Sequence, residues 1–544
     1  MDTDPTRRGN RDETTMTTAT QSIDAVVVGA GFAGLYMVQR LREAGFTVQG
    51  VEAAGDVGGT WYWNRYPGAR CDIPSLLYSY TWSDDLRDSW RWSEKYATQP
   101  EILAYAEHVA DRYHLRRSFL FDTKVVSAVF NAATGRWRVE TDGGQVFDAR
   151  FCIMATGCLS VPRVPDIPGA ASFQGEAYVT GQWPHEGVDF KGKRVAMIGT
   201  GSSAIQSMPL IAKDAAQVTV FQRTPNFSLP ALNAPLTDEE VAAFNEAFPI
   251  YKQLLDSGEP GLPLPPKGWV PTDAELAALV EQLWNGGGLI SAVMIPDLVK
   301  NERINEAAAD FVRAKIREIV KDPVMAAKLS PTSFPLAAKR ACVDTDYFAS
   351  YNRDNVTLVD LRDTPIAAIT ATGVRTSDAD YPADIIVYAL GFDAMTGALL
   401  NIDIRGRDGL ALRDVWRDGP KTYLGVAVAG FPNLFTVTGP GSPSVLSNML
   451  NSIEQHVDWI FDAIQHVKQT QAAVMEATPA AQEDWVAHVN DEADQTLYPR
   501  AASWYVGANV PGKPRVFMPY VGEGYKKRCD QIAADGYPGF ALSR

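Results

Sequence analysis

The chain has few cysteines, and no two of them form a C-x-x-C pair. Its five cysteines are scattered along 544 residues, at Cys71, Cys152, Cys158, Cys342 and Cys529. The missing pair argues against a redox dithiol, and the spacing suits neither a disulfide framework nor a zinc site. The six histidines show no metal-ligand spacing either. We therefore expect reduced thiols, a cytoplasmic location and no bound metal.

Long apolar runs and an excess of basic residues are also missing. No stretch approaches the roughly 20 apolar residues of a membrane-spanning helix. Residues 1–22 are polar, without the apolar segment of a signal peptide, and we interpret them as a disordered tail. The formal net charge of −15 argues against nucleic acid or an anionic membrane as a partner. The oligomeric state stays open, a monomer included.

A glycine-rich turn lies near the start of the chain. The β-branched run 26–28 leads into Gly29-Ala30-Gly31-Phe32-Ala33-Gly34, and a helical pattern follows. In a dinucleotide fold Gly29 permits the tight turn, Gly31 lets the backbone approach a pyrophosphate, and Gly34 lets the helix pack on the strand. The next strand ends in Glu52, where a carboxylate meets an adenosine ribose hydroxyl. This context favours a dinucleotide site over an ordinary βαβ turn.

A second glycine-rich turn follows the strand 194–198, with alanine at the permitted third glycine position. The next strand ends without a carboxylate, and Arg223 stands where it can bind a 2′-phosphate. We therefore interpret the second site as preferring NADPH over NADH, and assign FAD to the first. The expected cofactor contacts in this second fold are Gly199, Thr200, Gly201, Ser202, Ser203, Arg223 and Thr224.

Two such folds in one chain predict an α/β protein with two Rossmann-like dinucleotide-binding domains, one for FAD and one for NADPH. The expected divisions are a discontinuous FAD domain, 23–157 and 391–544, with a C-terminal lid segment, and an NADPH domain, 158–390, with a helical insertion at about 235–330. Residues 118–154 alternate like four strands of a small antiparallel sheet.

Glycines and aromatic rings alternate with polar residues in the segment 58–68, which begins Gly58-Gly59-Thr60-Trp61. Such a composition makes a poor helix and a poor strand, and it suits a loop folded against a large planar ligand. The alternative is a surface loop with buried aromatic rings. We include Gly59, Thr60 and Trp61 among the candidate cofactor contacts.

These motifs resemble those of type I Baeyer–Villiger monooxygenases, the flavin enzymes that turn ketones into esters or lactones. The resemblance runs from about Asp24 to the C-terminus, and its most specific pieces are the segments 58–68, 339–340, 391–394, 502–504 and 507–513. It implies an FAD- and NADPH-dependent enzyme that uses O2 and a small-molecule ketone. One oxygen atom would be inserted beside the ketone carbonyl by way of a peroxyflavin.

The resemblance also implies roles for individual residues. Arg340 would be the catalytic cation that stabilises developing negative charge, and Asp72 would orient it. Lys339 would join Arg223 at the 2′-phosphate, and Trp504 on the lid would reach the nicotinamide ribose. The residues expected to line the ketone pocket are Cys158, Leu159, Ser444, Val445, Leu446 and Met449.

Two positions depart from the family pattern. The fingerprint F-x-G-x-x-x-H-x-x-x-W begins at Phe173 and holds Val179 in place of histidine, and Leu390 stands where threonine is usual. The remaining alternatives are an N- or S-oxygenating flavin monooxygenase, which shares both nucleotide folds, and a non-oxygenating NADPH-binding flavoprotein. The segment 61–68 and Lys339-Arg340 favour ketone oxidation over the first alternative, and intact Arg340 and Asp72 argue against the second.

Overall fold

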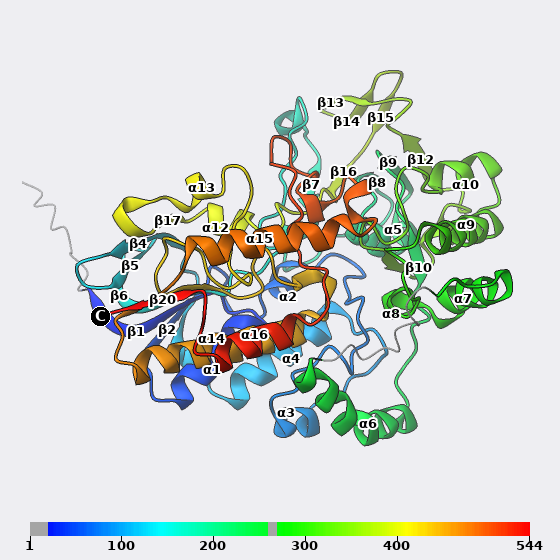
Figure 1. Ribbon diagram of the computed structural model, residues 1–544. Helices are drawn as coiled ribbons and strands as arrows, with labels where there is room; N and C mark the ends of the chain where they lie inside the picture. The colour runs from blue at the N-terminus through cyan, green and yellow to red at the C-terminus, as the bar shows by residue number, and fades with distance from the viewer. Residues whose placement is uncertain (1–19, 259–268) are drawn as a thin grey trace, which may run out of the picture.

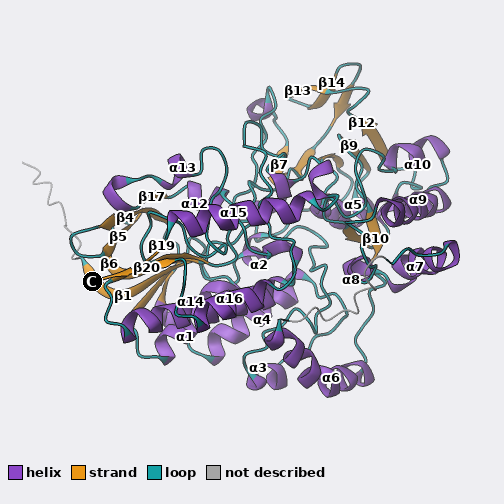
Figure 2. Cartoon of the chain, in the orientation of Figure 1, coloured by secondary structure: helices purple, strands orange, loops and turns teal. Residues whose placement is uncertain are grey.

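The structure, a computed structural model, describes residues 20–258 and 269–544, and its strands form two large sheets (Figures 1 and 2). Of the tail expected at residues 1–22, residues 1–19 lie outside the described chain. Gln21 and Ser22 correct that expectation, because they are the first residues of strand β1 (Gln21–Val28) and pair with β6 (Val146–Met154). Pairing with a neighbouring strand overrides the polar character of these two residues.

The first sheet has the order β17-β4-β5-β6-β1-β2-β3, and β18 adds to β6. Strands β1, β2, β3, β6 and β18 run parallel, whereas β4, β5 and β6 pair antiparallel. The remaining bounds are β2 (Val48–Val51), β3 (Phe119–Leu120), β4 (Val125–Asn131), β5 (Arg136–Thr141), β17 (Asp403–Arg405) and β18 (Leu434–Thr436). The expectation of four antiparallel strands is wrong for β3, which extends the nucleotide fold beside β2.

Helices α1, α4, α14 and α16 pack together beside this sheet (Figure 1). Their bounds are α1 (Phe32–Glu43), α4 (Gln99–Arg112), α14 (Met449–Gln469) and α16 (Tyr525–Ala534). The shorter or more peripheral elements of this half are α2 (Thr60–Trp63), α3 (Asp84–Ser89), α12 (Gly397–Leu400), α13 (Leu412–Val415), α15 (Pro479–Asp494), β19 (Val474–Ala477) and β20 (Phe540–Ser543).

The second sheet is wholly parallel, with the order β12-β9-β8-β16-β7. Its strands are β7 (Glu176–Val179), β8 (Arg194–Ile198), β9 (Gln217–Gln222), β12 (Val356–Asp360) and β16 (Ile385–Tyr388). Nearby elements are α5 (Ser202–Asp214), α11 (Tyr347–Ser350), β10 (Ser228–Pro230), β11 (Cys342–Asp344), β13 (Ile366–Thr370), β14 (Gly373–Thr376) and β15 (Asp380–Pro382). Near-continuous apolar runs in β8 and β16 follow from burial on both faces of the sheet.

The expected helical insertion is present but divides between the two halves of the molecule. Helix α6 packs on the first half, where Asn451 Nδ2 on α14 donates to Tyr251 Oη over 2.8 Å. Helices α7, α9 and α10 instead share one apolar core with α5 and the second sheet. The helices are α6 (Asp238–Ser257), α7 (Asp273–Gly286), α8 (Gly288–Val293), α9 (Glu302–Ile319) and α10 (Pro323–Leu329).

A buried carboxylate on α14 fixes the chain that follows Asp72. Glu454 is 7% exposed, and it accepts hydrogen bonds from the backbone N–H of Thr81, over 2.5 Å, and from the Thr81 hydroxyl. Burial raises the pKa of Glu454 to about 7, although the bonds from Thr81 lower it. The folded protein therefore binds a proton at Glu454 that the unfolded chain releases near pH 4.5.

The free energy of unfolding should fall as the pH rises from about 4.5 to 7, because Glu454 loses its proton over this range. We predict that Glu454→Gln abolishes this fall. The stabilisation from this group is complete below about pH 4.5 and declines by roughly 1.4 kcal/mol per pH unit as pH rises toward 7. A glutamine stays neutral, so the variant should match the parent at pH 5 and unfold at a higher temperature at pH 8. Thermal unfolding across this range measures the difference. Glu483→Gln, at an exposed ion pair, is the control, and parallel curves for parent and Glu454→Gln would contradict the prediction.

Candidate active site

The first glycine-rich turn joins β1 to α1 in a space that excludes side chains. Gly29 has φ +110°, and a Cβ there would clash with the carbonyl oxygen of Ala155 at the end of β6. A Cβ on Gly34 would clash with the carbonyl oxygen of Gly29. Gly31 is the N-cap of α1 and places no side chain on the N–H groups of the first turn. Those N–H groups suit a phosphate anion.

Glu52 and the aromatic loop complete this cradle. The Glu52 carboxylate is buried and accepts from the N–H groups of Ala30, over 2.6 Å, and Ala54, over 2.7 Å. Burial raises its pKa, which these bonds partly offset. Gly59 has φ +53°, and a Cβ on it would lie 2.8 Å from Gly31 Cα, so the two glycine loops face each other closely. Each Glu52 oxygen keeps acceptor capacity for a ribose hydroxyl.

Thr60 and Trp61 open α2 next to that loop. Trp61 is buried, and its Nε1 donates to Tyr78 Oη over 3.1 Å, whereas Thr60 is exposed. The indole therefore packs within the protein and its N–H is already used. Thr60 is the one of the two whose side chain is open to a ligand.

The second glycine-rich turn repeats the geometry of the first. Gly199 has φ +117°, and a Cβ on it would clash with the carbonyl oxygen of Ala389. A Cβ on Gly29 would clash with the carbonyl oxygen of Ala155 in the same way. Gly201 is the N-cap of α5, again without a side-chain cap, and no described atom lies within 4 Å of the place where its Cβ would be. The turn therefore leaves open space beside the free N–H groups of α5.

The hydroxyl groups near this turn already have partners in the protein. Thr200 Oγ1 donates to the carbonyl oxygen of Thr224 over 2.8 Å. Ser203 Oγ lies 3.1 Å from Thr180 Oγ1, and Ser202 Oγ lies 3.3 Å from Cys342 Sγ. A pyrophosphate here would therefore meet backbone N–H groups first, with the hydroxyls shaping the turn.

Two expected phosphate contacts, Arg223 and Lys339, lie near a third cation that the sequence did not indicate. Burial and the charge of Arg223 lower the pKa of Lys339, and the same two causes lower the pKa of Arg163. In the described part of the chain none of these three cations has a carboxylate within ion-pair distance. Asp393 and Asp166 offset part of this repulsion at Arg163, whereas the only neighbouring charge that shifts the pKa of Lys339 is that of Arg223, so Arg223 and Lys339 are the cations that best suit a multiply charged anion.

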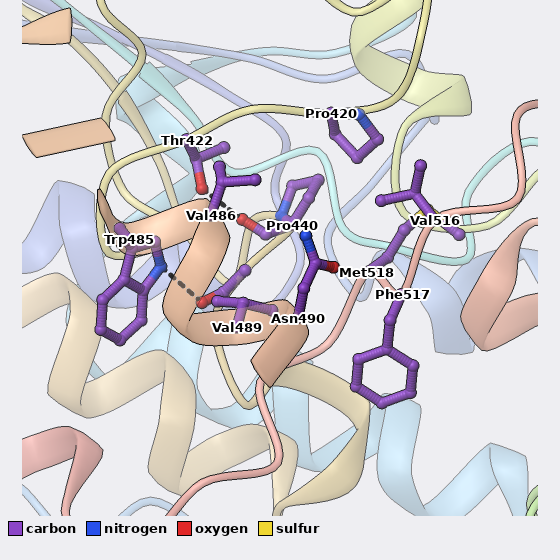
Figure 3. Close-up of a pocket in the computed structure, with 11 residues that line it drawn as sticks. Pro420, Thr422, Pro440, Trp485, Val486, Val489, Asn490, Val516, Phe517 and Met518 are labelled. Atoms are coloured by element: carbon purple, nitrogen blue, oxygen red, sulfur yellow. Dashed lines mark hydrogen bonds between the residues drawn. The ribbon is translucent and has the colours of Figure 1, made fainter. Parts of the chain in front are cut away.

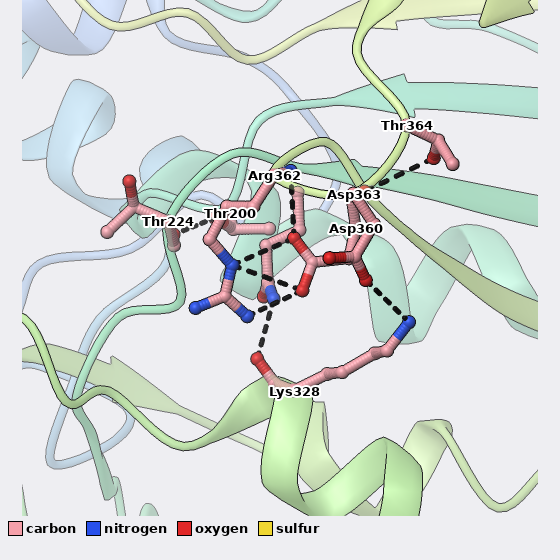
Figure 4. A network of polar contacts seen from close by, with 8 residues as sticks. Thr200, Thr224, Lys328, Asp360, Arg362, Asp363 and Thr364 are labelled. Carbon is pink, nitrogen blue, oxygen red and sulfur yellow. Dashed lines mark hydrogen bonds and ion pairs between the residues drawn. The ribbon is translucent and has the colours of Figure 1, made fainter. Parts of the chain in front are cut away.

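A polar network lies near Thr200 and Thr224, where β9 and β12 end (Figure 4). Arg362 holds the buried Asp360 through both carboxylate oxygens, with Nε–Oδ1 at 2.9 Å and Nη2–Oδ2 at 2.5 Å. These hydrogen bonds lower the pKa of Asp360. The Asp-x-Arg spacing after a predicted strand was the available signal for this pair.

Arg340 and Asp72 meet as the resemblance implies. Arg340 Nε and Nη2 donate to the two oxygens of Asp72 over 2.6 and 2.8 Å, and Nη1 donates to the carbonyl oxygen of Val445 over 2.6 Å. About a fifth of each charged side chain is exposed, 21% in both cases. Burial disfavours both charges, but their attraction outweighs it, so the pKa of Asp72 falls and that of Arg340 rises.

A buried asparagine on α9 holds the segment that carries Arg340. Asn305 Oδ1 accepts from the N–H of Leu336 over 3.0 Å, and its Nδ2 donates to the carbonyl oxygens of Leu336 and Leu298 over 2.9 and 2.8 Å. The segment turns sharply here, with Ala337 at φ +64°. Sequence reasoning missed Asn305, whose only signal was a polar residue on the apolar face of a helix.

Of the six residues expected to line the ketone pocket, Val445 and Cys158 lie near Arg340, and Ser444 adjoins both. Ser444 Oγ donates to Met395 Sδ over 3.9 Å, and Val445 contacts Arg340 through its carbonyl. Burial raises the pKa of the Cys158 thiol to about 11, so it stays neutral. One apolar cluster includes Cys158, Leu159, Val445, Leu446 and Met449, and Ser444 is fully buried next to them.

Trp504 lies in a short turn, Trp504–Val506, that also carries a buried tyrosine missed from the sequence. The rings of Trp504 and Tyr505 are 4.5 Å apart between centroids. Burial raises the pKa of Tyr505 to about 12, while the adjacent Arg340 lowers it. The turn therefore places Tyr505 next to the Arg340 guanidinium.

The two departures from the family pattern lie on one apolar cluster. Val179 ends β7 and pairs with Tyr388 of β16, and Leu390 follows two residues after Tyr388. Both pack against a core that includes Ile198 and Tyr388. Val179 and Leu390 thus fill one apolar environment between the second sheet and the second inter-domain connection.

A small cavity lies behind the loop 439–441 (Figure 3). Its volume is about 10 Å³, enough for about one water molecule. Trp485 Nε1 donates to the carbonyl oxygen of Gly441 over 3.0 Å, and Thr422 Oγ1 donates to that of Pro440 over 2.6 Å. These contacts support the loop and do not form a substrate site.

Over residues 20–258 and 269–544 we find no metal-binding cluster and no helix able to span a membrane.

Comparison with known proteins matches almost the whole chain. A profile of the pyridine nucleotide-disulphide oxidoreductase family matches residues 26–241, which include both glycine-rich turns. The structure of an oxidized steroid monooxygenase bound to NADP is 48% identical, with a TM-score of 0.91, covering 96% of this chain and all of that one. A Baeyer-Villiger monooxygenase of Pseudooceanicola batsensis is 41% identical over 96% of both chains. A phenazine N-monooxygenase of Lysobacter antibioticus is 39% identical over 95% of this chain and 97% of its own.

We predict that Asn305→Asp loosens the segment that holds Arg340. Aspartate still accepts from the N–H of Leu336 but cannot donate to the two carbonyl oxygens, and each lost bond costs about 1–3 kcal/mol. Amide hydrogen exchange over residues 334–341 should speed up. Asn301→Asp is a matched control on α9, because Asn301 only accepts, at the N-cap, and aspartate caps equally well. Equal exchange in both variants would refute a holding role for Asn305.

Proposed function

Because the chain belongs to the Baeyer–Villiger monooxygenase family, we propose how its own residues carry out that reaction. The enzyme uses FAD and NADPH and inserts one atom of O2 beside a ketone carbonyl, giving an ester or lactone. When bound, the flavin supplies the activated oxygen and NADPH supplies the electrons. The observation that carries the residue-level proposal is the buried Arg340, held by Asp72 and the carbonyl of Val445.

We assign FAD to residues 23–157 with 391–544, and NADPH to residues 158–390. Support for the first assignment comes from the cradle in which Gly31 faces Gly59 and the buried Glu52 keeps acceptor capacity. Support for the second comes from Arg223 and Lys339, which form no ion pair in the described chain and suit a 2′-phosphate. Trp504, on the C-terminal segment, would contact the nicotinamide end.

Arg340 is placed to stabilise negative charge on the ketone oxygen. Three of the five N–H groups of the guanidinium are used, two on Asp72 and one on Val445, and the remaining ones are shared between Tyr505 and the substrate. Asp72 stays ionised because its pKa is lowered, and it therefore keeps Arg340 in one orientation at neutral pH. A cation that is already fixed in a site with little water does not have to reorient as negative charge develops on the substrate, so the reaction avoids that free-energy cost.

The surroundings of Arg340 suit a neutral, apolar substrate. Besides Asp72, the residues near Arg340 include Val445, Tyr505 and the neutral thiol of Cys158, none of which carries a charge at neutral pH. Apolar walls with one directed polar group orient a ketone with its oxygen toward the guanidinium. Bulky or cyclic ketones fit this description best.

N-oxygenation is the second candidate, because a full-length relative is a phenazine N-monooxygenase. The test is product mass spectrometry after incubation of the holoenzyme with NADPH, O2 and two panels, one of cyclic and aryl ketones and one of nitrogen heteroaromatics. Esters or lactones from the first panel support the proposal. N-oxides alone would replace it with the second candidate.

We also propose that the enzyme acts in the cytoplasm. The five cysteines, all buried and unpaired, support a reducing compartment.

Arg223→Ala should shift cofactor preference. Loss of a charge-assisted contact to a phosphate costs roughly 1.5–3 kcal/mol, or about 10- to 150-fold in affinity. The KM for NADPH should rise by that factor and the KM for NADH should barely change. Arg375→Ala, which breaks an exposed ion pair with Asp380 in the same domain, serves as the control. Equal losses for both cofactors would overturn the phosphate assignment.

Arg340→Ala should abolish oxygen insertion while leaving cofactor binding. Removing one fixed charge stabiliser costs about 3–4 kcal/mol, or two to three orders of magnitude in rate. The variant should retain FAD, still oxidise NADPH, and release hydrogen peroxide without ester. Arg340→Lys should fail nearly as badly, since an ammonium cannot engage Asp72 through two parallel bonds. Ester formed by Arg340→Ala at close to the parent rate would sink the mechanism but not the fold.

A further inference from the structure

Three segments that pass between the two domains meet at one junction. The first connection leaves β6 and passes residues 161–163, and the second leaves β16 and passes residues 391–394. The third is the C-terminal segment that follows α15. Its Ala501 packs in the core of the second domain and its Tyr505 in the core of the first. This segment also carries Trp504.

The first two connections are tied together by their backbones. The N–H of Arg163 donates to the carbonyl oxygen of Gly391 over 2.9 Å, and the N–H of Asp393 donates to that of Val161 over 2.8 Å. Between them Pro162 and Phe392 face each other in an antiparallel bridge. A Cβ on Gly181 would lie 2.8 Å from the Phe392 ring, so the bridge is also pressed against the second domain.

The C-terminal segment is fastened to this bridge by two side chains. Asn509 Nδ2 donates to the carbonyl oxygen of Phe392 over 2.7 Å. Lys513 Nζ donates to Asp393 Oδ1 over 2.5 Å and to the carbonyl oxygen of Ala394 over 2.8 Å. The Lys513 side chain is only 10% exposed, against 34% for Asp393. An ammonium buried to this degree depends on its partner, because unpaired it would have to be rehydrated.

We propose that Lys513, assisted by Asn509, is a positioning residue that fastens the Trp504–Tyr505 turn to the second inter-domain connection. Because Lys513 is paired with Asp393, the position of the Trp504–Tyr505 turn next to Arg340 depends on the position of the two inter-domain connections. Cofactor retention and exclusion of water at Arg340 then respond to the relative position of the domains. The functional part of this proposal rests on the assignment of Trp504 to NADPH. The fastening itself does not.

The first experiment uses the oxidised holoenzyme without ketone, so it remains valid whatever the product of turnover. Amide hydrogen exchange over residues 500–515 is measured for the parent, Lys513→Met, Asp393→Asn and the double variant, with and without NADP+. Each single variant should exchange faster there by about tenfold or more, with unchanged FAD content. The double variant should be no worse than either single one, since both remove the same contact.

Two further variants separate fastening from general loss of a charge. Lys513→Arg keeps a cation within reach of Asp393 and should restore slow exchange. Lys421→Met breaks an ion pair of 2.8 Å with Glu483, between distant and exposed parts of the chain, and should leave the segment unaffected. Unchanged exchange in Lys513→Met, or an equal increase in Lys421→Met, would overturn the proposal.

The second experiment tests the consequence for the cofactor. The Kd of NADP+, followed by quenching of protein fluorescence, should rise about tenfold in Lys513→Met and Asp393→Asn. Hydrogen peroxide formed per NADPH consumed should rise in the same variants, while the NADPH-dependent reduction of FAD keeps its parent rate. Faster exchange with an unchanged Kd would overturn the link to cofactor retention and leave Trp504 without its assigned role.

Discussion

The buried pair of Arg340 and Asp72 is the contact on which the arrangement of the molecule depends. Removing either charge from water costs several kcal/mol, which is recovered only while both partners are held in contact. Asp72 belongs to the loop after α2, Arg340 follows the helical insertion, and Val445 comes from the segment before α14. Segments separated by hundreds of residues must therefore come together before the charges of Arg340 and Asp72 can be paired. Assembly of the site and assembly of the domains are one process.

The same need explains the unusual supports around Arg340. A guanidinium keeps one orientation only if both its N–H groups and its backbone are held in place. Asn305 fixes the backbone of its segment from α9, Glu454 fixes the chain after Asp72 from α14, and Tyr505 lies against it from the C-terminal turn. These supports come from three elements that are remote in sequence. The helical insertion thus has a structural purpose, since α9 holds the segment that carries Arg340.

Features that depend on local geometry could be predicted from the sequence, and features that depend on distant contacts could not. Gly29 and Gly199 were predictable because a turn between strand and helix demands positive φ and the absence of a Cβ. The contact between Arg340 and Asp72 could be predicted only from the resemblance to the family. Arg163 escaped notice because nothing local marks it, and its neighbours become apparent only when the connections are folded. Strand β3 was misassigned because two alternating residues do not reveal which strand they pair with.

The paired departures Val179 and Leu390 show how a family pattern can change without loss of the fold. Val179 and Leu390 are both partly exposed, so the positions do not demand a polar pair. Their aliphatic side chains instead pack on the cluster around Tyr388. This cluster borders the second inter-domain connection, so its apolar packing helps to hold that connection in place. Lys513 and Asn509 contact the same connection from the C-terminal segment.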